Sequence, residues 1–424
     1  MLMGVVDTMM VGHLSARALA SVALGNLYFY GCAAFGMGTL MALDPVVAQA
    51  VGARDDAAVT RAIQRGLALA VVLSLLVSLA MLPAGAALAW LGQPPELIDE
   101  AAAYTLASIP GVLPLLLFVV LRQTMQALGR IAPIVATIVF ANLANVLLNW
   151  ALIYGNLGAP ALGTVGSAWA SSASRALMAV GLLAVGWPAL RAHLRHWRAD
   201  SMAVAPLARM LHLGVPIGAQ HVLEYGAFGA IALLMGQLGT SQIAAHQVAI
   251  NLASLTFMVP LGVGSAAAVL VGRAVGEGDP ALARRSALAA IACGVLFMCA
   301  TAVILLAVPG LLARAYTNDA TVIAIAATLI PIAGVFQVFD GLQVVSLGVL
   351  RGVGDTRIPM LINIVGFWIL GIPLSAYLGF RTAAGPRGLW WGLVFGLAVV
   401  SLVLAARVRV QIGGRLRRLV IDHA

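Results

Sequence analysis

The 424-residue sequence contains no lysine, so arginine supplies all 24 of its basic residues. Charged residues of both signs make up only 9% of the chain, whereas a soluble domain has about a quarter. Hydrophobic residues make up 62% of it. Because so little polar sequence is available to cover the surface of a fold in water, the composition excludes a soluble protein and indicates an integral membrane protein.

Cysteine is also scarce, and Cys32, Cys293 and Cys299 lie in apolar runs without the spacing of a metal site. The start carries no basic region followed by a small-residue cleavage site, so no secretory signal peptide is expected. The glycine-rich stretch "GRAVGEGD" (272–279) lacks the preceding strand and following lysine of a phosphate-binding loop, and predicts a turn between spans. With no nucleophile or metal cluster near an interface, we expect neither an enzyme nor a cofactor.

Long apolar runs are what the sequence has in abundance, and each needs about 20 residues to cross a bilayer as a helix. A further run, 1–12, is too short to span; either the true start lies upstream or the first span is incomplete, and we favour the former. No run shows the alternation of a barrel strand, which predicts an all-α membrane protein. The eleven full-length runs are 18–43, 66–91, 101–121, 131–154, 161–188, 210–238, 243–272, 286–313, 320–350, 358–380 and 388–406.

The arginines are distributed unevenly between the two sides of these spans. When the loops are assigned to alternating sides, 19 arginines fall on one side and 4 on the other, with Arg175 inside a span. The positive-inside rule then places both termini in the cytoplasm. The net charge of +9 is spread over short loops, so nucleic acid is not an expected partner, whereas the tail "RVRVQIGGRLRRLVIDHA" (407–424) is expected to meet membrane lipid headgroups.

The chain repeats itself at an offset of 224 positions. Gly12 corresponds to Gly236 and Arg61 to Arg285, and "GHLSARALASVALG" (12–25) resembles "GQLGTSQIAAHQVA" (236–249). We therefore expect an N-terminal lobe (1–195), a cytoplasmic linker (196–204) and a C-terminal lobe (205–424) with a basic tail. Each lobe would hold six helices in the same orientation, twelve in all, related by an axis along the membrane normal and suited to alternating access.

Ionisable residues inside the apolar runs are the strongest functional signals, because an insertion cost of about 2.5–3.5 kcal/mol usually directs them to an interior cavity. Five qualify: Asp7, Asp44, Arg175, Glu224 and Asp340. A neutral amide would join helices at lower cost than Glu224 or Asp340, which favours a functional role for these two. Asp44 lies near the cytoplasmic end and is interpreted as a turn or gate residue. The partner of Arg175 stays unassigned.

Uncharged polar residues form stripes on several of the same helices. They either hydrogen-bond between helices or line the cavity, and the sequence leaves both open. Aromatic residues and methionine nearby would give adaptable apolar contacts to flat cations. The cavity candidates are Asn145, Asn149, Gln220, Gln247, Asn251 and Gln337, and the candidate drug contacts are Tyr225, Phe228, Met258 and Phe336.

Several motifs in order, "VDTMMVGHL", "VAQAVGA", "GVPIGAQHVLE", "AAHQVAIN", "VGRAVGEGD" and "FDGLQVVSLGVLRGVGDTRIP", together resemble the multidrug and toxic compound extrusion (MATE) transporters, in particular the bacterial NorM-like branch. The resemblance covers nearly the whole chain. It implies a twelve-helix, two-lobed protein, which we expect in the bacterial inner membrane and as a monomer, although the sequence does not give the oligomeric state. Such a protein exports organic cations, drugs and other toxins, driven by influx of Na⁺ or H⁺.

The resemblance also implies roles for single residues. Glu224 and Asp340 match the two carboxylates of the second lobe that bind the coupling cation, with Na⁺ possible there, and Asp7 matches the aspartate of the first helix. Asn145 and Asn149 match the polar pair of the fifth helix, although some relatives carry aspartate at the position of Asn149. Phe336 stands where some relatives have tyrosine, which removes one polar contact to a cation.

The resemblance and the residues together give a mechanism, in which desolvation penalises the charged carboxylates and a cation or proton restores neutrality. The principal alternative is a flippase for a lipid-linked oligosaccharide or lipid precursor of similar fold, which would need basic residues in its cavity. A membrane-embedded enzyme and a channel are further alternatives. The sequence does not distinguish Na⁺ from H⁺ or name the drugs.

Overall fold

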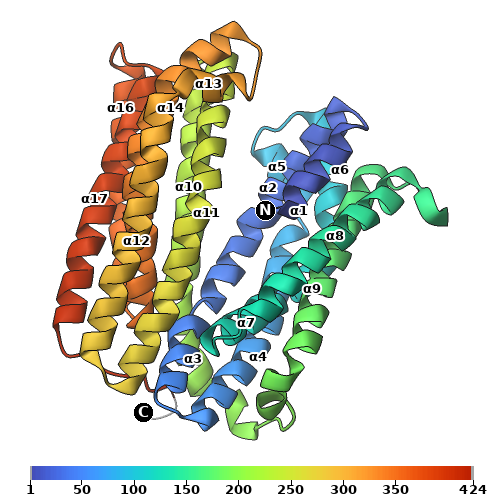
Figure 1. Ribbon diagram of the computed structural model, residues 1–424. Helices are drawn as coiled ribbons and strands as arrows, with labels where there is room; N and C mark the ends of the chain where they lie inside the picture. Colours follow the sequence, from blue (N-terminus) through green and yellow to red (C-terminus); the bar gives the residue numbers. More distant parts are fainter. Residues whose placement is uncertain (1, 422–424) are drawn as a thin grey trace. The chain divides into compact units, whose positions relative to one another are not determined.

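The structure, a computed structural model, describes residues 2–421, and the expected domain limits at positions 1 and 424 lie outside them. Within the described part the chain is helical and contains no strand (Figure 1). The all-α class expected from the sequence is thereby confirmed.

Eleven helical segments in the described part are long and apolar enough to cross a membrane, one for each full-length apolar run of the sequence. Helix α1 (Leu2–Gly12), which corresponds to the short run 1–12, has 11 residues, fewer than the about 20 that a bilayer requires. Helix formation follows from the solvent, because hydrocarbon offers no partner to an open backbone N–H or C=O group. The chain is thus a multi-pass membrane protein.

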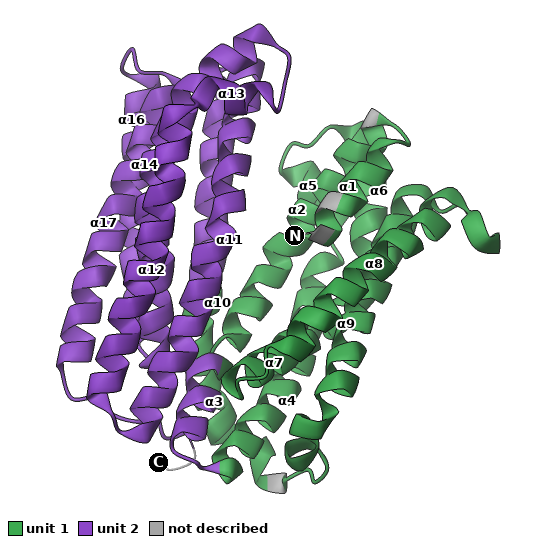
Figure 2. Cartoon of the chain, in the orientation of Figure 1, with its two compact units in different colours: residues 1–43, 56–218 green, residues 44–55, 219–424 purple. Residues whose placement is uncertain are grey.

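Packing divides the chain into two compact units, shown separately coloured in Figure 2. Unit 1 comprises residues 1–43 and 56–218, and unit 2 comprises residues 44–55 and 219–424. The helices of unit 1 besides α1 are α2 (Ala16–Leu40), α4 (Asp56–Met81), α5 (Ala84–Trp90), α6 (Pro95–Ala107), α7 (Val112–Ala127), α8 (Ala132–Tyr154) and α9 (Gly163–Leu194), with short 3₁₀ turns η1 (Ile109–Gly111), η2 (Asn156–Gly158) and η3 (Ala199–Met202).

Unit 2 is built around α14, which packs against α11, α12 and α17. The helix α10 (Val204–Leu238) begins in unit 1 and ends in unit 2. The helices of unit 2 are α3 (Leu43–Gly52), α11 (Thr240–Glu277), α12 (Pro280–Ala307), α13 (Pro309–Arg314), α14 (Ala320–Gly352), α15 (Arg357–Asn363), the π-helix η4 (Ile364–Gly371), α16 (Ile372–Phe380) and α17 (Pro386–Gly413).

The repeat seen in the sequence recurs in the helix limits. Helix α11 begins at Thr240, 224 residues after α2 begins at Ala16, and α12 begins at Pro280, 224 residues after α4 begins at Asp56. The copies differ in one respect: α11 is a continuous helix, whereas its counterpart is broken between α2 and α3 at positions 41–42.

The two units exchange short segments relative to the halves expected from the repeat. Residues 44–55 belong to the first half by sequence but pack in unit 2. The reason is a close crossing of α3 and α11, where a Cβ atom added at Gly52 would meet the carbonyl oxygen of Arg273, and one added at Gly276 would meet that of Gln49. Small residues permit such backbone approach between membrane helices. Since Gly52 and Gly276 are equivalent by the repeat, the crossing is itself pseudo-symmetric.

The reciprocal exchange involves the start of α10. Residues 205–218 belong to the second half by sequence but pack in unit 1. Gly214 and Gly218 face α2 there, and a side chain at either position would meet backbone at Thr39 or Phe35. The boundary between the units therefore falls within α10 rather than within the linker that precedes it.

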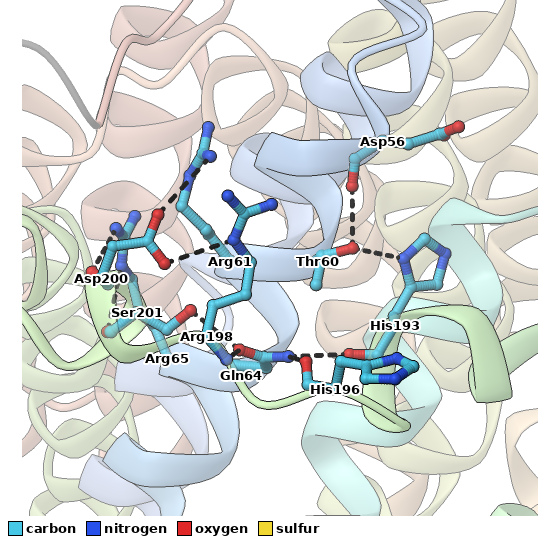
Figure 3. A network of polar contacts seen from close by, with 10 residues as sticks. All are labelled: Asp56, Thr60, Arg61, Gln64, Arg65, His193, His196, Arg198, Asp200 and Ser201. Carbon is cyan, nitrogen blue, oxygen red and sulfur yellow. Dashed lines mark hydrogen bonds and ion pairs between the residues drawn. The ribbon is translucent and has the colours of Figure 1, made fainter.

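That linker is folded onto unit 1 by a polar network centred on Gln64 of α4 (Figure 3). The fully buried Gln64 amide donates to the carbonyl oxygens of His193 and His196, both at 2.9 Å. Its oxygen accepts from Arg198 N at 3.0 Å and from Ser201 Oγ at 2.8 Å. Around it, Arg61 and Arg198 form ion pairs with Asp200, and Thr60 bonds the His193 ring. Because the amide uses both its donor and acceptor atoms, it ties the end of α9 to the linker.

The described part of the C-terminal tail also folds back onto the protein. Arg418 forms an ion pair with Asp55 at 2.8 Å, and the backbone N–H of Leu419 donates to Gln49 Oε1 at 2.7 Å. Gln49 in turn donates to the carbonyl oxygen of Gly352 at 2.8 Å. These contacts secure the segment 44–55 within unit 2.

Candidate cation sites

The first candidate site lies in unit 1 around Asp7 of α1, which is 2% exposed. Asn149 of α8 donates to one carboxylate oxygen at 2.6 Å, and Ser171 of α9 donates to the other. Asn145, one turn before Asn149, is fully buried beside the carboxylate. Within the described residues, the side-chain oxygens of Asn145 and Asn149 have no hydrogen-bond partner. The site therefore combines one carboxylate with amide oxygens that retain acceptor capacity.

Arg175, whose partner the sequence left open, lies beside this site on α9. Its guanidinium stacks over the ring of Phe29 at 4.0 Å and is within electrostatic range of Asp7. A planar guanidinium over an aromatic face is favourable, more so where water is excluded. Arg175 is thus held by an aromatic ring and a nearby carboxylate inside unit 1.

The second candidate site lies in unit 2 and joins α10 to α14. Glu224 is partly buried and Asp340 is 8% exposed, and the two carboxylates lie within electrostatic range of each other. Gln343, one turn beyond Asp340, donates its amide to Glu224 Oε1 at 2.5 Å. The structure thus brings together the two carboxylates that the sequence singled out from segments more than 100 residues apart.

A π-helix borders the second site. Asn363, 1% exposed, ends α15 where η4 begins and accepts a long 3.5 Å bond from Gln343. Trp368 of η4 donates to the carbonyl oxygen of Leu223, next to Glu224 in α10. π-Helical turns in membrane and soluble helices frequently mark functional sites, because they shift side chains out of the regular ladder.

The remaining polar candidates do not all surround the carboxylates. Gln337 is fully buried, accepts from Thr256 at 2.7 Å and donates to Thr301 at 2.7 Å, so it joins α14 to α11 and α12. Gln247 donates to Asn251 on the same exposed face of α11. Gln220, one turn before Glu224, is 5% exposed.

The candidate drug contacts separate in the same way. Phe336 is 1% exposed and packs edge-to-face against Phe228 at 6.0 Å and Trp390 at 5.8 Å, so it belongs to the core. Tyr225 is 42% exposed, and Phe228 and Met258 are partly exposed. Only these last three could reach a molecule outside the core without a rearrangement.

Gln343 and three further residues were not among the candidates from the sequence, although Gln343 shares a helix face with Asp340. Ser171 and Asn363 are polar residues inside apolar runs, and the criterion used for the asparagines of α8 applied equally to them. Arg351 directly follows the apolar run 320–350 and was counted among the loop arginines of the cytoplasmic side, but it is buried and forms a 3.2 Å ion pair with Asp44. No sequence pattern joins positions 44 and 351.

Transition-metal binding has no support in the described residues, since no three His, Cys, Asp or Glu side chains gather at one point. The carboxylate and amide oxygens of the two candidate sites are instead the ligand type of hard cations.

Solved structures share this fold over nearly the whole chain. The crystal structure of the eukaryotic MATE transporter AtDTX14 matches with a TM-score of 0.87 and 23% identity, covering 96% of this chain and 90% of that one. A MATE protein in the bent conformation matches with a TM-score of 0.86 and 20% identity, covering 97% and 91%. The fold is therefore that of the MATE transporters.

Sequence comparisons define the family more closely. The MatE family model matches residues 1–151 and 216–377. A probable multidrug resistance protein NorM of Mesorhizobium japonicum is 38% identical over 414 residues, which are 95% of this chain and 88% of the relative. The multidrug resistance protein PmpM of Pseudomonas aeruginosa is 36% identical, with coverage of 96% and 87%. The chain belongs to the MatE family, as a bacterial NorM-like member, and it is a transporter rather than an enzyme.

Proposed function

We propose that this protein is a secondary active antiporter that exports organic cations, drugs and toxins in exchange for Na⁺ or H⁺. Its relatives of similar length carry the name multidrug resistance protein, which supports efflux of several compounds. The observation that carries the coupling part is the pair Glu224 and Asp340. Two carboxylates from different helices lie in mutual electrostatic range, and Gln343 donates a hydrogen bond to Glu224.

The pair acts as the coupling site for a physical reason. Two negative charges held close together away from water repel each other, and a bound cation or proton removes that repulsion. Binding therefore favours a different arrangement of the surrounding helices from the empty pair. Coupled to alternation between inward-open and outward-open states, this difference lets downhill cation entry drive uphill export.

The other residues have supporting roles in this proposal. Asp7 with Asn145 and Asn149 forms a second acidic site, in which the unpartnered amide oxygens supply further ligands. Tyr225, Phe228 and Met258 offer apolar contact to flat cations, with Phe336 packed against Phe228. The protein acts as a monomer in the bacterial inner membrane, surrounded by lipid and with both termini cytoplasmic.

The test uses purified protein in liposomes and a fluorescent cationic dye. Dye efflux is followed under an imposed Na⁺ gradient and, separately, under a pH gradient. We expect one gradient to drive efflux in the wild type and Asp340→Asn to reduce that response at least about tenfold. The matched control is Asp319→Asn, which changes the exposed cap of the same helix and keeps a good capping residue.

Two results would count against the proposal. Unchanged coupling in Asp340→Asn would remove the carboxylate pair from the mechanism. No dye movement under either gradient, with folded protein in the membrane, would favour the flippase alternative, and lipid-linked substrates would be tested next.

A further inference from the structure

A buried ion pair in unit 2 connects the proposed coupling site to the segment that the first half of the chain contributes. Arg351 Nη1 of α14 lies 3.2 Å from Asp44 Oδ2 of α3, and the two side chains are 10% and 2% exposed. Each of the ion pairs formed by Arg17, Arg61, Arg198, Arg407 and Arg418 has a partner at least 32% exposed, so the pair of Arg351 with Asp44 is buried more deeply than these. A buried pair is a weak source of stability, because desolvation offsets much of its attraction, so its presence calls for another role.

Arg351 lies on the helix that already contacts Glu224 through Gln343. Helices α10 and α14 run in opposite directions, since three consecutive reversals separate them in the chain. Helical side chains lean toward their own N-terminus, so Glu224 leans toward the start of α10 and Arg351 leans toward the start of α14, each toward the other. The same face of α14 reaches Glu224 two turns earlier through Gln343. The guanidinium lies within electrostatic range of the Glu224 carboxylate.

Resting on the proposed function, we propose that Arg351 is a positioning residue shared between Glu224 of the coupling site and Asp44 of α3. When the coupling site is empty, the negative charge of Glu224 draws the guanidinium away from Asp44. When a cation or proton neutralises Glu224, the guanidinium moves fully to Asp44. Cation binding thereby tightens the hold of unit 2 on α3.

Segment 44–55 is placed to respond to a change in the ion pair between Arg351 and Asp44. It is the only part of unit 2 that comes from before residue 219, and the chain continues from it into unit 1 at both ends. Its far end is anchored independently of Arg351, through the pair of Asp55 with Arg418 and the hydrogen bonds of Gln49. A change at Asp44 therefore acts on a segment whose other contacts stay in place.

The charged groups around the guanidinium define the sign of the expected effects. Asp44 of α3 forms the ion pair with it, Glu224 of α10 lies within its electrostatic range, and Asp340 of α14 lies within that of Glu224. The positive charge of Arg351 opposes a cation at Glu224, and Asp44 screens that opposition. Removing Arg351 should strengthen cation binding, whereas removing Asp44 should weaken it, because the unscreened guanidinium then turns to Glu224.

The experiment measures, in proteoliposomes, the cation concentration that gives half-maximal dye efflux. Na⁺ is titrated at fixed pH, with choline chloride replacing NaCl. Protons are titrated separately by changing the pH in the absence of Na⁺. Intrinsic tryptophan fluorescence in detergent provides the same titration without transport, since Trp368 is bonded beside Glu224. For the active cation, Arg351→Gln should lower the half-maximal concentration and Asp44→Asn should raise it, each by about tenfold. Arg418→Gln also removes one positive charge that pairs with segment 44–55, but at Asp55 rather than Asp44. This control variant should leave the half-maximal cation concentration unchanged.

Opposite shifts are the signature, because a merely structural ion pair would make both single variants change the response in the same direction. Shifts of the same sign, or none, overturn the inference. If a single variant does not fold, the double variant Asp44→Asn/Arg351→Gln leaves no buried charge unpaired. The double variant should lower the half-maximal concentration as Arg351→Gln does, and an unchanged value overturns the inference. Failure of the proposed function is distinct: the wild type would then show no cation response, or Asp340→Asn would retain it.

Discussion

Replacing Gln64 by methionine should destabilise the junction between α9 and the linker. Methionine has nearly the same length and a similar helix propensity, so the substitution removes the polar atoms while α4 stays intact. Four groups lose their partner: the carbonyl oxygens of His193 and His196, the backbone N–H of Arg198 and the hydroxyl of Ser201. The first of these belongs to the last turn of α9, where the helix itself supplies no partner.

The expected magnitude follows from those four bonds. Each hydrogen bond contributes about 1 kcal/mol net, so loss of all four would cost about 4 kcal/mol if the partners stayed buried. Two of the four partner residues, His196 and Arg198, are exposed, so water can replace part of the loss. We therefore expect the free energy of unfolding to fall by about 2–3 kcal/mol.

Two assays check this value in the purified protein. Unfolding by sodium dodecyl sulfate in mixed micelles gives the change in free energy. Trypsin, which cleaves after arginine, should cut at Arg195 or Arg198 several-fold faster in the variant. The matched control is Gln93→Met, whose amide is exposed and makes one long 3.4 Å bond, and it should change stability by less than about 0.5 kcal/mol. If the Gln64→Met protein were as stable as the wild type and were cleaved at the same rate, Gln64 would not hold the linker on unit 1.

Two further substitutions test the packing of unit 2. Gly276→Ala should lower the yield of folded protein and cost about 1–3 kcal/mol or more, because its Cβ would meet the backbone of Gln49, whereas Gly262→Ala on the same helix enters open space and should be tolerated. Gln337→Met should cost about 2 kcal/mol by breaking the bonds to Thr256 and Thr301, measured by the same unfolding assay, and should not alter which cation drives efflux. A loss of cation response at full stability in the Gln337→Met protein would return this residue to the coupling site.

Much of the architecture could be predicted from the sequence, because a bilayer restricts each spanning segment to an apolar helix of a certain length. Apolar length determines where a span lies, and the absence of water requires that span to be a helix. The same logic identified Asp7, Glu224 and Asp340, since a carboxylate in hydrocarbon is too costly to be accidental. The offset of 224 residues likewise needed no coordinates, because it is carried by the order of the residues alone.

What the tertiary structure alone decided is which side chains meet. Gln337 and Gln343 flank Asp340 equally in sequence, yet one joins α14 to its neighbouring helices and the other bonds Glu224. Asp44 and Arg351 are 307 positions apart, and their pairing depends on a crossing that only small residues at Gly52 and Gly276 permit. Helix periodicity assigns a residue to a face, but the partner of that face depends on backbone distances of a few ångströms between segments distant in the chain. That is why the spans and the carboxylates were evident from the sequence, whereas the exchange of segment 44–55 and the buried position of Arg351 were not.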